Sequence, residues 1–375
     1  MMKSSRLLFI AYGIGTIGVL LQIAAAHWDV SWHILGIVET FFTPPHAMLY
    51  AGIGLTIVAA LLGIYLRTKS DTPLLTGLLI AAVGGSMQLI SGPIDFWWHA
   101  TYGFDPYLFT PTHTILITGL LLGGVGMALG ASRLLTARDG RVYLEGFMPS
   151  GRLLQAMVIV TLAVLWLEMN FFLEWLFNAQ GIAYTFRICS PAVISARSCS
   201  FVGSFYGTIF FPALVLYSAT GTLVLFTSKR LLGWKGVATV VGGIVIGIQV
   251  STDIAFPSSL LLAGNIPGSF YLAGSHTLLG QQLASGIPFY LALLIPIALF
   301  DVLVEQSNTK ILLAAILLGP VSLYSDVSFP FFGGLWSIEP GLIPIFGAPM
   351  LIGGLVAGLA RTRFTDRLLQ QVTRT

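Results

Sequence analysis

The sequence predicts an all-α, polytopic integral membrane protein with about ten transmembrane helices, and two observations lead to this prediction. The 375 residues are 56% hydrophobic and 9% charged, with a mean hydropathy of +0.88, whereas a soluble domain carries about a quarter charged residues. Apolar segments long enough to cross a hydrocarbon core, which takes roughly 20 helical residues, also recur along the whole chain. We therefore expect the lipid bilayer to surround most of this protein.

Short loops rich in Lys and Arg separate successive pairs of apolar segments. Basic residues precede the first segment, separate the second from the third, the fourth from the fifth, the sixth from the seventh and the eighth from the ninth, and follow the tenth. The ten expected spans lie near residues 6–26, 47–66, 73–92, 114–132, 153–175, 204–228, 233–251, 283–304, 311–325 and 343–360.

All basic residues except Arg187 and Arg197 fall in these loops. Because short loops rich in Lys and Arg stay in the cytoplasm, we expect both termini to be cytoplasmic and the protein to be integral to the plasma membrane. The net charge of +3 thus indicates topology and not nucleic-acid binding. Lys3 and Arg6, which precede an apolar stretch ending in Ala26, also fit a cleaved secretory signal, although that stretch is long for one.

Related motifs in the two halves of the chain predict an internal duplication of a four-helix unit. The segment DVSFP at 326–330 resembles DVSWH at 29–33, and DIAFP occupies 253–257. Parallel repeats of this kind are a known membrane architecture. The expected parts are a metal-site four-helix membrane unit at 1–135, a connecting helix pair with an external Cys-containing loop at 136–230, and a degenerate second four-helix membrane unit at 231–375.

Histidines and acids gather in the loops expected on the external, or periplasmic, side, where two segments share one pattern. Each segment reads D-x-x-W-H, then an acid, then F-T-P-x-H, over 27–46 and again over 93–113. Ionisable groups near the hydrocarbon are costly and are usually paired or functional. The six residues that recur are Asp29, His33 and His46 in the first segment and Asp95, His99 and His113 in the second.

The spacing of these residues predicts two metal sites. Asp and His four residues apart lie on one face of a helix, and the Thr-Pro before His46 and His113 starts a new helix, so each of these histidines falls in a first turn. Two imidazoles and one carboxylate suit a first-row transition metal and leave coordination positions open. The alternative is a pair of hydrogen-bonded Asp-His contacts that join helix ends.

These motifs resemble the C-type membrane subunit of the copper membrane monooxygenases, the particulate methane monooxygenase and ammonia monooxygenase family, over residues 20–125. In that family a D-x3-H-x12-H set forms one copper site, and a second set, an acid or amide followed by x3-H-x13-H, comes one helical hairpin later. The resemblance implies copper at both sites, and a complex with a cupredoxin-bearing subunit and another membrane subunit. Asp95 departs from the pattern, since methane-oxidising relatives typically have Asn there, and some 250 residues follow the second motif.

Several other residues are candidates for supporting roles. We expect Glu39, Asp105, Trp32 and Trp98 to surround the metal ligands, and Cys189 and Cys199 are candidates for a disulfide in the external loop. Glu168 and Glu174, with Asn170, either point into the bundle as a proton or ion relay or lie solvated at the interface. Asp253 and His276 would form a residual site in the second unit.

The sequence leaves two classes of function open. The first is a copper-binding membrane protein related to the C-type monooxygenase subunit, either part of a membrane oxidase or monooxygenase complex acting on a small substrate with O2, or a non-catalytic relative. Iron or zinc would also suit the ligands. The second is a metal transporter or a copper-delivery or assembly factor without oxidase activity, which predicts further metal ligands through the bilayer; the spans show few.

Overall fold

A computed structural model describes residues 2–34, 40–69, 72–102, 110–139, 150–177, 196–262, 294–304, 308–324 and 343–373. Each regular element in these ranges is a helix, which confirms the all-α prediction. The elements are α1 (Met2–Ile34), α2 (Pro44–Arg67), the short 3-10 helix η1 (Pro73–Leu75), α3 (Thr76–Tyr102), α4 (Pro111–Asp139), α5 (Gly151–Phe177), α7 (Ala196–Leu232), α8 (Val237–Leu262), α10 (Leu294–Leu303), α11 (Asn308–Tyr324) and α13 (Ile343–Thr373).

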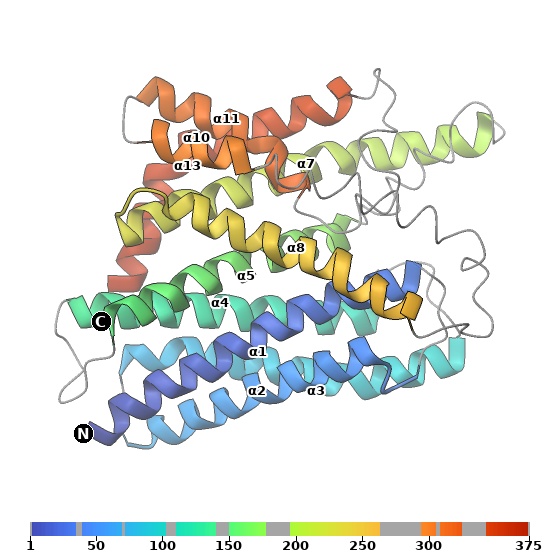
Figure 1. The fold of residues 1–375 in the computed structure, drawn as a ribbon. Coiled ribbons are helices and arrows are strands. Elements are labelled where there is room, and N and C mark those ends of the chain that lie inside the picture. Colours follow the sequence, from blue (N-terminus) through green and yellow to red (C-terminus); the bar gives the residue numbers. More distant parts are fainter. Residues whose placement is uncertain are drawn as a thin grey trace.

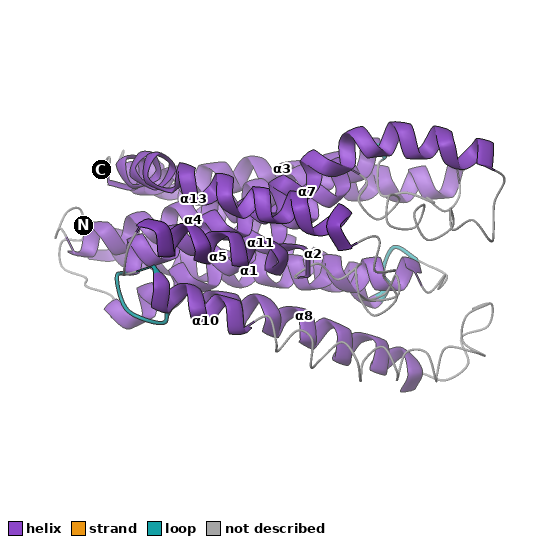
Figure 2. Ribbon diagram, turned by 90° about the horizontal axis from the view of Figure 1, so that it is seen from above, coloured by secondary structure: helices purple, strands orange, loops and turns teal. Residues whose placement is uncertain are grey.

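Most of the helices run side by side along one long axis, whereas the C-terminal part of α13 crosses it, and the two chain termini lie at the same end of the bundle (Figure 1, Figure 2). Within the described ranges, five are long and apolar enough to cross a membrane: Arg6–Asp29, Pro44–Arg67, Pro73–Tyr102, Pro111–Ala137 and Gly151–Leu173. The chain therefore has the character of a helical integral membrane protein. The full set of ten spans stays a prediction, and no internal repeat is detected in the described part of the chain.

Helix α3 is longer than the span expected from hydropathy, which ended at residue 92. It continues through Pro93 to Tyr102, so Asp95 and His99 belong to the same helix as the apolar segment. The polar residues after Pro93 lower the local hydropathy but do not end the helix, as the expected helical spacing of Asp95 and His99 requires. Proline is tolerated inside membrane helices when neighbouring groups satisfy the freed backbone, and the continuation carries the polar side chains to the end of the bundle.

Glycines set the spacing and register of the α3–α4 hairpin. A Cβ atom at Gly84 would overlap the carbonyl oxygen of Gly119, and one at Gly77 would overlap that of Gly126. The two backbones therefore approach as closely as only glycine permits, as in other membrane helix pairs. Seven residues beyond Gly84, the Ser91 hydroxyl donates to the carbonyl oxygen of Thr112 at 2.8 Å. This register brings the end of α3 to the start of α4.

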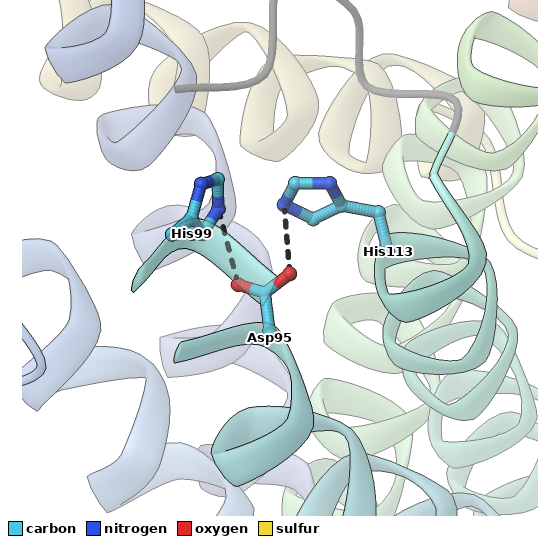
Figure 3. Close-up of side chains that lie close together, drawn as sticks. All are labelled: Asp95, His99 and His113. Atoms are coloured by element: carbon cyan, nitrogen blue, oxygen red, sulfur yellow. Dashed lines mark ion pairs between the residues drawn. The ribbon is translucent and has the colours of Figure 1, made fainter. Parts of the chain in front are cut away.

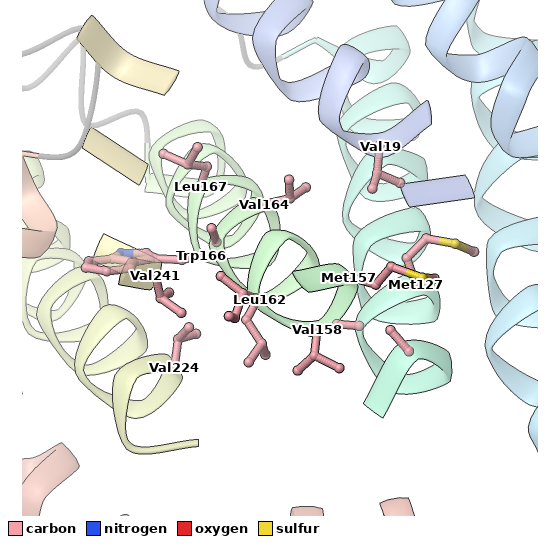
Figure 4. Packing of buried hydrophobic residues seen from close by; sticks show 14 of the residues in the cluster. Val19, Met127, Met157, Val158, Leu162, Val164, Trp166, Leu167, Val224 and Val241 are labelled. Carbon is pink, nitrogen blue, oxygen red and sulfur yellow. The ribbon is translucent and has the colours of Figure 1, made fainter. Parts of the chain in front are cut away.

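Helix α5 lies at the centre of the bundle and packs against α1, α4, α7 and α8. Its buried side chains, including Leu162 and Trp166, meet Val19 of α1, Met127 of α4 and Val241 of α8 in one apolar cluster (Figure 4). Because α5 contacts helices from both halves of the chain, it joins the α1–α4 unit to the C-terminal helices. This position buries most of the side chains in the middle of α5.

Candidate metal centre

Asp95, His99 and His113 come together where α3 ends and α4 begins. Asp95 and His99 lie one turn apart on α3, and Nε2 of His99 is 3.5 Å from Oδ2 of Asp95. His113 is the third residue of α4, and its Nε2 is 3.8 Å from Oδ1 of Asp95. The carboxylate thus stands between the two imidazoles and turns one oxygen toward each (Figure 3).

The three ligand atoms have a spacing that fits a metal ion. All of them lie within 4.8 Å of one another, and metal–ligand bonds of about 2.1 Å place the atoms of a tetrahedral site about 3.4 Å apart. Both Asp–His separations are close to that value, but each involves a different carboxylate oxygen. The side chains therefore have to shift slightly to place one oxygen and two nitrogens around an ion. His113 is buried, while Asp95 and His99 are partly exposed, which leaves one side of the group open.

Two threonines that precede His113 determine which of its ring nitrogens faces Asp95. The Thr112 hydroxyl donates to Oδ1 of Asp95 at 2.5 Å, because a carboxylate can only accept. Its single proton is then used, so in the 3.1 Å contact between the two hydroxyls Thr110 must be the donor. In the arrangement in which Thr110 donates to Thr112, Nδ1 of His113, 2.8 Å from the Thr110 oxygen, is the donor of that contact and carries the proton. Nε2 is left as the atom that can bind a metal.

The first motif repeats part of this arrangement at the junction of α1 and α2. Nε2 of His46 lies 3.1 Å from Oδ1 of Asp29, and Nδ1 of His46 is 3.0 Å from the carbonyl oxygen of Thr40. A carbonyl can only accept, so Nδ1 again carries the proton and Nε2 again faces the carboxylate. His46 is the third residue of α2, as His113 is of α4. His33 lies on α1, but its side chain is outside the described residues.

Aromatic residues lie between the two groups. The ring of Phe41 is 5.4 Å from that of Phe96 on α3 and 4.9 Å from that of Tyr50 on α2. Phe96 directly follows Asp95, and Tyr50 lies one turn beyond His46. Both groups are therefore at the same end of the bundle, with an apolar contact between them.

The predicted supporting residues are only partly accounted for. Trp98 packs on Tyr102, with ring centroids 4.6 Å apart. The other candidates lie outside the described residues, wholly or in their side chains: Glu39, Asp105, Trp32, Cys189, Cys199, Asp253, His276 and Glu174. Their roles stay predictions. The roles of Thr110 and Thr112 were missed; the F-T-P-x-H motif contains Thr110, whereas Thr112 occupies its variable position. At the first site the contact to His46 comes from the backbone carbonyl of Thr40, which no side-chain motif indicates.

One alternative is wrong: Glu168 is not solvated at the interface. Its side chain is fully buried, as is that of Asn170, which accepts a hydrogen bond from Thr220 at 3.4 Å. The burial follows from the central position of α5, which the sequence did not indicate.

The evidence for a metal site at Asp95 is the chemistry of the three side chains themselves. Two imidazoles and a carboxylate, from a helix end and the first turn of its antiparallel neighbour, form a candidate metal-binding group. No protein-family model, curated protein or solved structure matches the chain.

Proposed function

We propose that the protein is a copper-binding integral membrane protein related to the C-type membrane subunit of the copper membrane monooxygenases. The observation that carries the proposal is the convergence of Asp95, His99 and His113 from two helices. Asp29 and His46, joined by His33, form the second site of the proposal. The family kinship rests on the motif spacing and its flanks, which the similar geometry of the two helix junctions supports.

Copper is the metal of choice because it stands at the top of the affinity order for nitrogen and oxygen ligands, with iron and zinc as alternatives. In an oxidase or monooxygenase complex, a bound copper ion would supply the redox chemistry with O2 on a small substrate. The residues of this chain hold and orient the ligands. Thr112 holds the Asp95 carboxylate, and Thr110 holds His113 in the tautomer that presents Nε2. Such supporting hydrogen bonds tune metal affinity.

The proposed topology has ten spans with cytoplasmic termini and both metal sites on the external side. The position of the two termini at one end of the bundle, away from the ends of α1 and α3 that carry Asp29 and Asp95, supports it (Figure 1). The proposed duplication relates α1–α4 to the C-terminal helices, in which consecutive helices also pack together. Further membrane subunits would complete the complex.

A metal transporter or copper-delivery factor is the competing proposal, and the residues beneath the sites weigh against transport. Gln88 of α3 donates to Gln22 of α1 at 2.7 Å, and Gln22 donates to Thr56 of α2 at 2.7 Å. These amides and hydroxyls are buried and bonded to one another. They are not the imidazole, thiolate or thioether ligands that would pass a copper ion along.

Metal analysis of the purified full chain tests the proposal. After copper loading and removal of loose metal, the unmutated protein is expected to hold two equivalents, and His99→Ala and His33→Ala are each expected to hold one. His27→Ala is the matched control, because it removes a histidine at the same end of the bundle that belongs to neither motif; it should retain both. The absence of bound metal after loading with copper, iron or zinc would refute the proposal.

A further inference from the structure

Glu168 is a carboxyl group buried within the helix bundle that has no role in either metal site. It lies within the candidate span Gly151–Leu173 of α5, and its side chain has no exposed surface. Neither carboxyl oxygen has a hydrogen-bond partner among the described residues. An ionised carboxylate without a donor is extremely costly in an apolar interior, whereas the protonated acid is neutral.

The neighbouring helix leaves space for this carboxyl group. A Cβ atom at Gly124 of α4 would coincide with the carboxyl group of Glu168, and Oε2 would be the atom nearest to it. The carboxyl therefore occupies the volume that any larger residue at position 124 would fill. The glycine at position 124 therefore leaves room for the acid between α4 and α5.

Asp301 shows how this fold treats a buried carboxylate with a structural role. It accepts hydrogen bonds from the backbone of Thr239 at 2.7 Å and from the Thr239 hydroxyl at 2.6 Å, and Lys229 lies 3.8 Å away. It thus caps the start of α8 as a bonded ion. Glu168 has none of these partners, so a capping or ion-pairing role does not explain it.

We propose that Glu168 is a proton-binding site inside the bilayer, which holds a proton as the neutral acid and exchanges it with the end of the bundle that carries Asp29 and Asp95. The proposal goes beyond metal binding and does not depend on it. Acidic residues within membrane spans commonly serve as proton relays. Glu168 is nine residues, or about 14 Å, from the end of α5 on that side, and about 26 Å from the other end.

The helices packed around α5 carry several described titratable groups, which include Tyr12 and Asp29 on α1, His113 on α4 and Tyr217 on α7. On α1, His27 is buried and its ring lies 5.8 Å from that of Phe171, one turn from Glu168. On α4 the described cation is Arg133, nine residues beyond Gly124, and on α7 Lys229 is engaged near Asp301. On α8, the side chain of Asp253 is outside the described residues.

A hydrophobic carbodiimide tests for the neutral acid in the full-length protein. N,N′-dicyclohexylcarbodiimide adds its central carbon to a protonated carboxyl oxygen, the carboxyl proton moves to one nitrogen, and acyl transfer to the other nitrogen gives a stable N-acylurea without a leaving group. Peptide mass spectrometry of the protein in lipid vesicles is expected to place one adduct on Glu168, none on Asp301 and none after Glu168→Gln. A water-soluble carbodiimide is expected to leave Glu168 unmodified.

Infrared spectroscopy tests the exchange of the proton. The protonated carboxyl C=O band of the unmutated protein should shift to lower frequency in D2O within minutes, and should be missing in Glu168→Gln. Three results would overturn the proposal: no adduct on a recovered Glu168 peptide, equal modification by the water-soluble reagent, or a carboxyl band that does not shift after a day in D2O. The first and third use only unmutated protein, so they decide the question even where the variant does not fold.

Discussion

Removal of the Thr112 hydroxyl is the sharpest perturbation of the Asp95 site, because Thr112→Val keeps the shape of the side chain. The substitution deletes the 2.5 Å hydrogen bond to Asp95. It also frees the Thr110 proton, which can then point at Nδ1 of His113 and favour the tautomer that protonates Nε2. Both changes affect the metal ligands Asp95 and His113, although neither ligand is itself substituted.

The expected magnitude follows from this loss. Loss of one outer hydrogen-bond partner of a metal ligand costs about 10- to 100-fold in metal affinity, or about 1.4–2.8 kcal/mol at about 1.4 kcal/mol per tenfold change. Thr112→Val is therefore expected to raise the copper Kd by that factor at the Asp95 site and to leave the Asp29 site unchanged. Competition with a chelator of known affinity, measured on the His33→Ala background, isolates the relevant site.

Thr114→Val is the matched control, since it makes the same change two residues later. The Thr114 hydroxyl donates only to the carbonyl oxygen of Thr110 within the same helix turn, at 2.7 Å. We expect its copper affinity to equal that of the unmutated site. Unchanged affinity in Thr112→Val, or an equal loss in both variants, would refute the role assigned to the Thr112–Asp95 contact.

Two further predictions concern stability, measured by thermal unfolding in detergent. Gly84→Ala pushes a methyl group against the Gly119 carbonyl and should destabilise the chain by about 1–3 kcal/mol. Gly54→Ala is the control: its methyl group meets nothing within 4 Å, so it should be neutral or slightly stabilising. Equal effects of the two substitutions would contradict the close packing of α3 and α4. Glu168→Leu should leave the stability unchanged or raise it, because no hydrogen bond is lost. Asp301→Leu should destabilise the chain by about 3 kcal/mol, because Lys229 loses its buried partner. A larger loss of stability in Glu168→Leu than in Asp301→Leu would show that Glu168 has structural partners.

Local chemistry made part of the candidate site predictable. Asp95 and His99 share a face of α3 because residues four positions apart on any helix do. Pro111 starts α4 because a proline has no N–H to lose in a first turn. Composition alone likewise indicated membrane helices, since a chain with 9% charged residues cannot cover a water-facing surface. These conclusions need only the geometry of one helix or the solvent preference of its side chains.

The tertiary structure decided which helices meet and in what register. His113 reaches Asp95 because glycines at 84 and 119 let α3 and α4 approach closely in one antiparallel register, and a slip of a few residues would separate the ligands. The hydroxyl chain through Thr112 depends on the same register. Glu168 is buried because α5 is enclosed by helices from both halves of the chain. Such contacts join residues far apart in sequence, so no local pattern of spacing or hydropathy specifies them.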